Sequence, residues 1–198
     1  MRRLITIIVV YFIAAVAPSY AQFLPAFINF AASGGHGSAV TVFSVTPSGD
    51  NAGNNGFTVR VLTGTIGTGG TQVRCTWSAG TGGTMSSPRA SVGISSGVNT
   101  NTVSTPVETL FGGGSGFAPI PASGSVTSDW TNLTSLTTDK IICLLYINTV
   151  GGVGDGHMAI QAGSSTGSIE VAGDQTANAT GGATGATYYA LTKVEVRQ

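Results

Sequence analysis

The sequence predicts an all-β protein, an antiparallel β-sandwich of the jelly-roll type. The longest apolar run outside the N-terminus, Ile141–Ile147, is too short for a stable helix and is bounded by turn-forming residues. Elsewhere, β-branched and aromatic residues occur in short groups separated by Gly-, Ser- and Thr-rich segments. Roughly eight to ten short strands with turns between them are typical of a sandwich or a jelly roll.

The segment Thr138–Asn148 is the expected centre of this fold. Its apolar run has no polar residue at every second position, which a half-exposed strand would have. A continuous apolar run of this length indicates a strand buried on both faces. The last segment, Thr187–Arg197, is predicted to be a half-exposed closing strand. In it, one set of residues alternates with Thr192, Val194 and Val196: Leu191, Lys193, Glu195 and Arg197.

The first residues have the pattern of a secretory signal peptide. Arg2 and Arg3 form a basic start, Leu4–Ala17 is apolar, and Ser19–Ala21 places small residues where a signal peptidase reads them. The apolar run is shorter than the roughly 20 residues that cross a bilayer. We therefore expect cleavage after residue 21 and a secreted chain, extracellular or periplasmic, that does not span a membrane. An uncleaved anchor is the alternative.

Cleavage would leave 177 residues, the size of one domain. We expect an N-terminal lead and first strand over 22–56 and the β-sandwich core over 57–198, together forming a single domain. Cleavage would also remove two of the eight basic residues, leaving six against eight acidic ones and a formal charge of −2. Such a chain lacks the overall basic charge that attracts nucleic acid or anionic lipid, so neither is an expected partner.

Charged residues make up 8% of the chain, against a typical ~25%. A polar but uncharged composition of this kind suits an extracellular protein. The two cysteines lie in separate predicted strands, and in an oxidising compartment an even number of cysteines is usually paired. We expect a disulfide between Cys75 and Cys143, with two buried free thiols as the alternative.

The segments Phe57–Thr65 and Thr71–Ser78 are predicted to form a hairpin joined by a glycine-rich turn. Apolar and polar residues alternate in both segments. A register that opposes the two apolar sets would bury Trp77 in the core and place Arg60 and Arg74 together on the outer face. Further strands are expected at Ala39–Thr46, Arg89–Ser95, Val107–Phe111, His157–Ala162 and Ser168–Ala172.

Two glycine- or asparagine-rich segments are candidate ligand loops. Gly112–Gly116 is not followed by a helix start or a lysine, so a loop or bulge is expected there and not a phosphate site. The loop at 50–56 is rich in oxygen ligands, and Asp50 and Asn54 are its candidate ligands for a structural calcium ion. It holds one carboxylate and lacks the EF-hand spacing, so we expect an ordinary turn and no cofactor.

Hydrolase chemistry is the weakest functional expectation. It needs two carboxylates, or a nucleophile with a histidine base. Asp155 and His157 form the one local acid–histidine pair, and neither a Gly-x-Ser-x-Gly nor a His-Glu-x-x-His motif is present. We therefore assign no catalytic residue and expect no enzyme.

A sugar-binding site needs an aromatic face for the pyranose ring and neutral hydrogen-bonding groups around it. Trp130 with its neighbour Asp129, together with Tyr188 and Tyr189, are the candidate ligand-binding residues. Consecutive residues of a strand point to opposite sheet faces, so at most one of the two tyrosines is expected to be deeply buried. Two alternatives are open for Trp130, packing in the core or at a sheet edge, or an exposed platform.

Three segments of the chain carry a family resemblance: Val126–Trp130, Asp139–Tyr146 and Ala190–Arg197. In outline they resemble the second half of galactose-binding-like jelly rolls, a fold of carbohydrate-binding modules. The chain is also similar to uncharacterised jelly-roll modules of bacterial and phage surface proteins. The resemblance implies a jelly-roll fold with aromatic ligand contacts and often a structural calcium. Residues matching the metal carboxylates cannot be identified, so only Trp130 is carried over, as a contact.

The sequence thus favours a secreted, non-catalytic β-sandwich that binds a glycan or another cell-surface polymer. A structural or assembly subunit of a surface layer, filament or virion-like particle is the first alternative, because low charge and a proline-bearing edge segment, Phe117–Ala122, suit self-association. A hydrolase is the second alternative.

Overall fold

The computed structural model describes residues 37–53, 55–148, 156–162, 168–182 and 187–198. The chain divides into two compact units, Met1–Gly37 and Ser38–Gln198. Nearly all of the first unit lies outside the described residues, so the signal peptide and most of the N-terminal lead stay predictions. Within the described part, no helix is long and apolar enough to cross a membrane.

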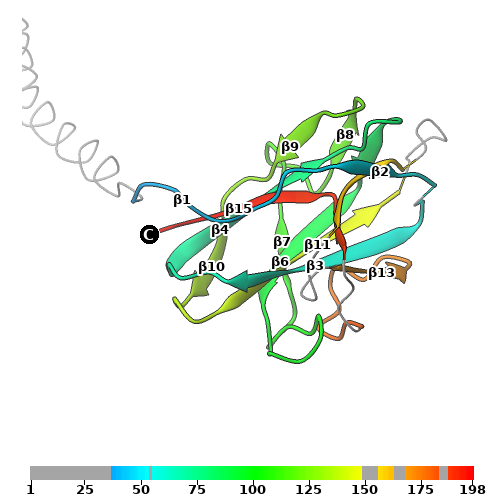
Figure 1. The fold of residues 1–198 in the computed structure, drawn as a ribbon. Coiled ribbons are helices and arrows are strands. Elements are labelled where there is room, and N and C mark those ends of the chain that lie inside the picture. Colours follow the sequence, from blue (N-terminus) through cyan, green and yellow to red (C-terminus); the bar gives the residue numbers. More distant parts are fainter. Residues whose placement is uncertain (1–36, 54, 149–155, 163–167, 183–186) are drawn as a thin grey trace, which may run out of the picture. The chain divides into compact units, whose positions relative to one another are not determined.

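The second unit is built around two large antiparallel sheets (Figure 1). We name the first one the β4 sheet. It has the strand order β1-β15-β4-β10, with β9 also paired to β4. Its strands are β1 (Val40–Ser44), β4 (Gly70–Ser78), β9 (Ser125–Thr127), β10 (Thr131–Ser135) and β15 (Leu191–Arg197).

The second large sheet, which we name the β11 sheet, has the order β13-β3-β11-β6-β7. Its strands are β3 (Phe57–Thr65), β6 (Arg89–Ile94), β7 (Val107–Thr109), β11 (Lys140–Ile147) and β13 (Ser168–Ala172). Two small sheets complete the described fold. One is β14-β12-β2, from β2 (Gly49–Asn51), β12 (Met158–Ala162) and β14 (Thr187–Tyr189), and the other pairs β5 (Met85–Ser87) with β8 (Phe117–Ile120).

The main core lies between the two large sheets. Val73, Cys75 and Trp77 of β4 belong to the same buried cluster as apolar residues of β3, β6 and β11. The predicted disulfide is present: Cys75 of β4 is bonded to Cys143 of β11, so the bridge joins the two sheets through their common core. The all-β sandwich prediction and the core position of Trp77 are confirmed, whereas the jelly-roll connectivity stays a prediction.

β11 is the central strand that the sequence predicts. It pairs with β3 on one side and β6 on the other. Ile141, Cys143, Leu145 and Ile147 face the core, while Ile142 and Leu144 form a second apolar cluster with Leu62 on the opposite face. All of these side chains are buried. On the side of Ile142 and Leu144, the loops at Thr100 and Asn178 contact the sheet through hydrogen bonds from Arg60.

The predicted hairpin is wrong. β3 and β4 have the expected boundaries to within one residue, but they lie in different sheets. The glycine-rich connection carries the chain from one sheet to the other. The apolar residues of β3 and β4 therefore share the core, although the two strands are not paired with each other: Val59, Val61, Val73 and Trp77. Arg60 and Arg74 consequently lie on the outer sides of two different sheets and do not share a face.

Several strands escaped prediction because they are short or polar. β2, β5, β9 and β10 fall in segments where no strand was predicted, and in β10 the buried positions Thr131 and Ser135 are hydroxyl residues. The predicted closing strand is split in two by Ala190, whose φ of 57° is in the left-handed region. The break separates β14, in a small sheet, from β15 in the β4 sheet.

Candidate functional site

The outer side of the β4 sheet is a polar surface, and none of the other sheets in the described part of the chain covers it. On β4 the apolar residues point into the core, so Gln72, Arg74, Thr76 and Ser78 point outward. We call this surface the β4 face and define it by those four residues and their outward neighbours on adjacent segments: Ser125, Thr127, Trp130, Asn132, Lys193, Glu195 and Arg197. Strand pairing fixes these neighbours, with Arg74 opposite Glu195 and Gln72 opposite both Asn132 and Arg197.

Trp130 lies on the β4 face, and it is the one aromatic residue among those that define this face. Its ring is contacted by two guanidinium groups, with the Cζ atoms of Arg74 and Arg197 at 4.4 and 4.2 Å from the ring centroid. These cation–π contacts hold the half-buried indole against the sheet. Of the two alternatives for Trp130, the structure therefore shows a surface residue stacked with arginine and not a core residue.

Hydrogen bonds order the charged and amide groups around the indole. Arg74 Nε donates to Glu195 Oε2 at 2.8 Å, and Lys193 Nζ lies 3.1 Å from the same oxygen. Burial raises the pKa of Glu195, but the hydrogen bonds and charges of Arg74 and Lys193 outweigh it, so the pKa lies below its ordinary value. Glu195 is ionised at neutral pH and neutralises one of the neighbouring cations.

Arg197 has a different environment from Arg74. Its Nε donates to Gln72 Oε1 at 2.8 Å, and Gln72 Nε2 donates to Asn132 Oδ1 at 2.7 Å. Among the described residues no carboxylate forms an ion pair with Arg197. The guanidinium is thus positioned by an amide and an indole, and its charge is not neutralised by a neighbour.

The opposite end of the β4 face is rich in hydroxyl groups. Thr76 Oγ1 and Thr127 Oγ1 are 2.9 Å apart, and Ser78 Oγ lies 3.1 Å from Thr192 Oγ1. Beyond them is a pocket of about 390 Å³ whose lining contains no charged residue. It is lined by Pro47, Ser48, Gly49, Ser78, Ala79, Gly80, Thr81, Ser123, Ser125 and Ala159. The face therefore runs from cations and an indole at one end to neutral hydroxyls at the other.

Asp129 is a structural residue. Its two carboxylate oxygens accept hydrogen bonds from the backbone N–H groups of Gly112 and Gly113, at 3.2 and 2.8 Å. Both glycines have positive φ, of 59° and 85°, in a tight turn closed by hydrogen bonds between Phe111 and Gly114. The carboxylate closes the predicted glycine loop and is engaged there, so we do not assign it to ligand binding.

The structure does not place the tyrosine candidates beside Trp130. Tyr189 is half-buried and packs against the main core, and its strand β14 belongs to a small sheet. The backbone of Tyr188 lies in the same strand, while its side chain is outside the described residues. Of the four predicted ligand-binding residues, Trp130 alone is found on an outer sheet face with a described side chain.

Asp50 pairs with His157, its partner being 107 residues away in sequence. His157 Nδ1 lies 2.7 Å from Asp50 Oδ2, joining β2 to the residue that precedes β12. A Cβ atom at Gly82 would lie 2.6 Å from that oxygen and 2.8 Å from His157 Cε1, so the glycine segment 80–83 packs directly on the pair. Asp155, the partner expected from sequence, is outside the described residues.

The described residues do not fit the calcium site for which Asp50 and Asn54 were the candidate ligands. Calcium takes six to eight oxygen ligands, whereas one oxygen of Asp50 is engaged by an imidazole nitrogen and the other is buried beneath Gly80. Asn54 lies outside the described residues. In the ranges that the structure covers, no group of three or more His, Cys, Asp and Glu side chains could hold a metal ion.

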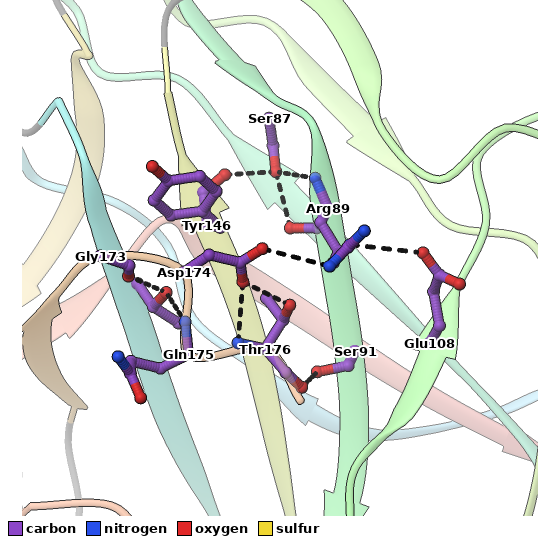
Figure 2. A network of polar contacts seen from close by, with 10 residues as sticks. Ser87, Arg89, Ser91, Glu108, Tyr146, Gly173, Asp174, Gln175 and Thr176 are labelled. Atoms are coloured by element: carbon purple, nitrogen blue, oxygen red, sulfur yellow. Dashed lines mark hydrogen bonds and ion pairs between the residues drawn. The ribbon is translucent and has the colours of Figure 1, made fainter. Parts of the chain in front are cut away.

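A second polar cluster lies on the outer side of the β11 sheet (Figure 2). Arg89 lies between two carboxylates, with Nε 3.7 Å from Glu108 and Nη1 3.3 Å from Asp174. Asp174 Oδ1 accepts hydrogen bonds from the backbone and hydroxyl of Thr176, and Ser91 donates to the carbonyl of Thr176. These contacts fasten the segment 173–177 to the sheet, which indicates a structural role.

Arg60 also fastens loops to the β11 sheet, and it does so in the buried interior. Its fully buried guanidinium donates to the carbonyl oxygens of Thr100 and Asn178, both at 2.8 Å. Burial lowers the pKa of this guanidinium from its ordinary value, and the carbonyls of two loops supply its partners. The sequence gives no signal for this position, because an arginine in an alternating strand is expected to face solvent.

No protein-family model matches the chain, and no curated protein is significantly similar to it in sequence. Functional assignment therefore depends on the geometry of the β4 face, of the Asp50–His157 pair and of the buried Arg60.

Proposed function

We propose that the mature chain is a secreted, non-catalytic β-sandwich that binds a glycan or another cell-surface polymer along the β4 face. The observation that carries this proposal is Trp130, an indole held on an outer sheet face by two guanidinium groups. A sugar ring would stack on the part of the half-buried indole that the two guanidinium groups leave open, with fixed hydrogen-bonding groups around it.

The dimensions of the face favour a polymer over a small molecule. Gln72 and Ser78 are six residues apart on one strand, a length of about 20 Å at the usual rise per residue. Amide and hydroxyl groups recur along this length, from Gln72 and Asn132 to Thr127 and Ser125. A chain of sugar units can be hydrogen-bonded repeatedly along such a row.

Two further observations support the secreted and the non-catalytic parts of the proposal. The disulfide is of a kind that persists in oxidising compartments, which agrees with the expected secretion. We assign the Asp50–His157 pair a structural role and not a hydrolytic one, because the His157 side chain is 11% exposed and the glycine segment 80–83 packs on it.

The proposal is tested with an array of plant, animal and bacterial polysaccharides, probed with the mature chain and with Trp130→Ala. We expect the wild type to bind a subset of the array and the variant to bind it about tenfold more weakly, since an aromatic contact contributes roughly 0.5–1.5 kcal/mol beyond the area it buries. Thermal unfolding of the variant controls for loss of fold. Binding that is unchanged in Trp130→Ala, or no binding by the wild type, would exclude this use of the face.

A structural subunit is the second candidate function. It is favoured by exposed apolar side chains on and near the edge strand β7: Val103 is 65% exposed, Val98 58% and Val107 40%. An edge strand with exposed valines can pair with a second copy of the chain. Light scattering on the mature chain distinguishes the two candidates, because a subunit forms large assemblies at micromolar concentration.

A further inference from the structure

We infer that the polymer bound by the β4 face is an acidic polysaccharide, with its anionic groups at the end formed by Arg74, Lys193 and Arg197. This inference rests on the proposed function and adds the chemical class of the ligand. It depends on how charge is distributed over the two outer sheet surfaces.

The β4 face carries three cations and a single carboxylate. Glu195 is bonded to both Arg74 and Lys193, so one negative charge is shared by two cations. Arg197 has no ion-pair partner among the described residues. The face thus has an excess of two positive charges, although the mature chain as a whole is slightly acidic.

The exposed arginine on the corresponding surface of the β11 sheet is already neutralised. There Arg89 lies between the carboxylates of Glu108 and Asp174 (Figure 2). An anionic polymer is therefore attracted more strongly to the β4 face, where Arg197 has no ion-pair partner among the described residues, than to Arg89. A neutral polymer would gain nothing from this asymmetry.

The geometry of Arg197 suits a carboxylate or sulfate group. Its Nε is bound by Gln72 and its Cζ lies over the Trp130 ring, so the guanidinium is held in one orientation before a ligand arrives. Arginine binds carboxylate and sulfate-like groups through two parallel N–H donors, and a fixed orientation reduces the entropy that binding must overcome. A sugar ring on Trp130 would bring its acidic substituent close to this group.

The uncharged pocket of about 390 Å³ beyond Ser78 complements this arrangement. Ionised groups would be desolvated there without a partner, whereas sugar hydroxyls find serine and threonine hydroxyls. The acidic units are thus expected at the Arg197 end of the face and neutral hydroxyls at the Ser78 end.

Polygalacturonate and its fully methyl-esterified form provide a matched pair of probes, because they differ in the charge of the carboxyl group. Dextran sulfate and dextran provide the same comparison for sulfate, and the two pairs separate carboxylate from sulfate recognition. We expect the mature chain to bind at least one acidic member tenfold or more tightly than its neutral counterpart, with affinity falling as salt is raised. Arg197→Gln is expected to weaken that binding about tenfold.

Arg89→Gln is the matched control, since it removes the same charge from the other sheet and is expected to change the affinity less than twofold. Trp130→Ala separates the two levels of inference. Equal binding of the charged and neutral members, weakened by Trp130→Ala, would overturn the acidic-ligand inference and leave the proposed function standing. Acidic binding that is insensitive to Arg197→Gln would also overturn it, and insensitivity of all binding to Trp130→Ala would overturn the proposed function as well.

Discussion

Arg60 is fully buried against main-chain carbonyls, whereas the Arg89 side chain is 52% exposed between two carboxylates. Replacing Arg60 by leucine would leave the carbonyls of Thr100 and Asn178 without donors in a site closed to water. We expect the free energy of unfolding to fall by about 3 kcal/mol, because each unpaired buried carbonyl costs 1–3 kcal/mol. Urea unfolding followed by circular dichroism measures the change.

Arg89→Leu is the control for this experiment. Its exposed ion pairs are expected to contribute less than about 1 kcal/mol. If both variants lose the same small amount of stability, the loops around 100 and 175–179 are not held by Arg60. Hydrogen exchange at these loops gives a second readout, since they should exchange faster in Arg60→Leu alone.

The pKa of Glu195 lies below its ordinary value, so Glu195 contributes to stability while it is ionised in the folded state. The unfolded chain binds its proton at an ordinary pKa of about 4.3, and the folded chain binds it at lower pH. This contribution is complete above the unfolded pKa and is lost as the pH falls through the folded one.

We therefore expect Glu195→Gln to be less stable than the wild type at neutral pH and equally stable at strongly acidic pH. Thermal unfolding between pH 2 and 7 measures both proteins under the same conditions. A constant difference across this range would show that the loss comes from packing and not from the ionised pair of Arg74 and Glu195.

The glycine segment between β4 and β5 is the element that covers the Asp50–His157 pair. A methyl group at Gly82 would meet both partners at less than 3 Å. Gly82→Ala is expected to displace the segment and to lower the free energy of unfolding by about 1–3 kcal/mol.

The matched substitution is Gly64→Ala at the end of β3, where an added Cβ atom meets nothing within 4 Å. That variant is expected to be neutral or slightly more stable, because alanine restricts the unfolded chain. Urea midpoints compare the two alanine variants, and equal midpoints would show that the segment 80–83 is not tightly packed on the pair.

Sequence pattern predicted individual strands better than their partners. β3, β13 and β11 were predicted closely, because hydrophobic periodicity is a local property. Alternation in β3 and β4 also identified which side chains face the core, but not that Thr58 and Arg60, on the other side of β3, are buried as well. It did not show whether two apolar sides lie next to each other in one sheet or face each other across a core, and the predicted hairpin failed for that reason.

For the candidate site, too, a single residue could be predicted from the sequence but its contacts could not. Trp130 was singled out by residue type and by its position before the long central strand. Its contacts with Arg74 and Arg197 depend on strands that are distant in sequence, and so does the pairing of Asp50 with His157. Such contacts leave no periodic or motif signal in a single sequence.

The disulfide joins the two sheets of the whole domain and links residues 68 apart in sequence. Closing a loop of this length in the unfolded chain is expected to contribute about 4 kcal/mol to stability. Replacing both Cys75 and Cys143 by alanine should therefore lower the free energy of unfolding by roughly this amount. Thiol titration of the unfolded wild type, which should detect no free thiol, checks that the bridge is formed in solution.

Multi-angle light scattering of the mature chain tests whether the protein is a binding module or a structural subunit that assembles. A binding module is expected to remain monomeric, since the β4 face is polar and its cations repel a second copy. A large assembly would favour the structural subunit. In that case Val103→Asp, placed among the exposed valines near β7, should dissolve the assembly, whereas Arg197→Gln should not.

Tryptophan fluorescence during a titration with a bound polysaccharide tests the role of the β4 face most directly. The chain contains two tryptophans, and Trp77 is buried in the core while Trp130 lies on the proposed binding surface. We predict a saturable change in emission for the wild type and its loss in Trp130→Phe, with cosedimentation monitoring binding. A polysaccharide that cosediments with the wild type without changing its emission, or that changes the emission of Trp130→Phe equally, would contradict binding at Trp130.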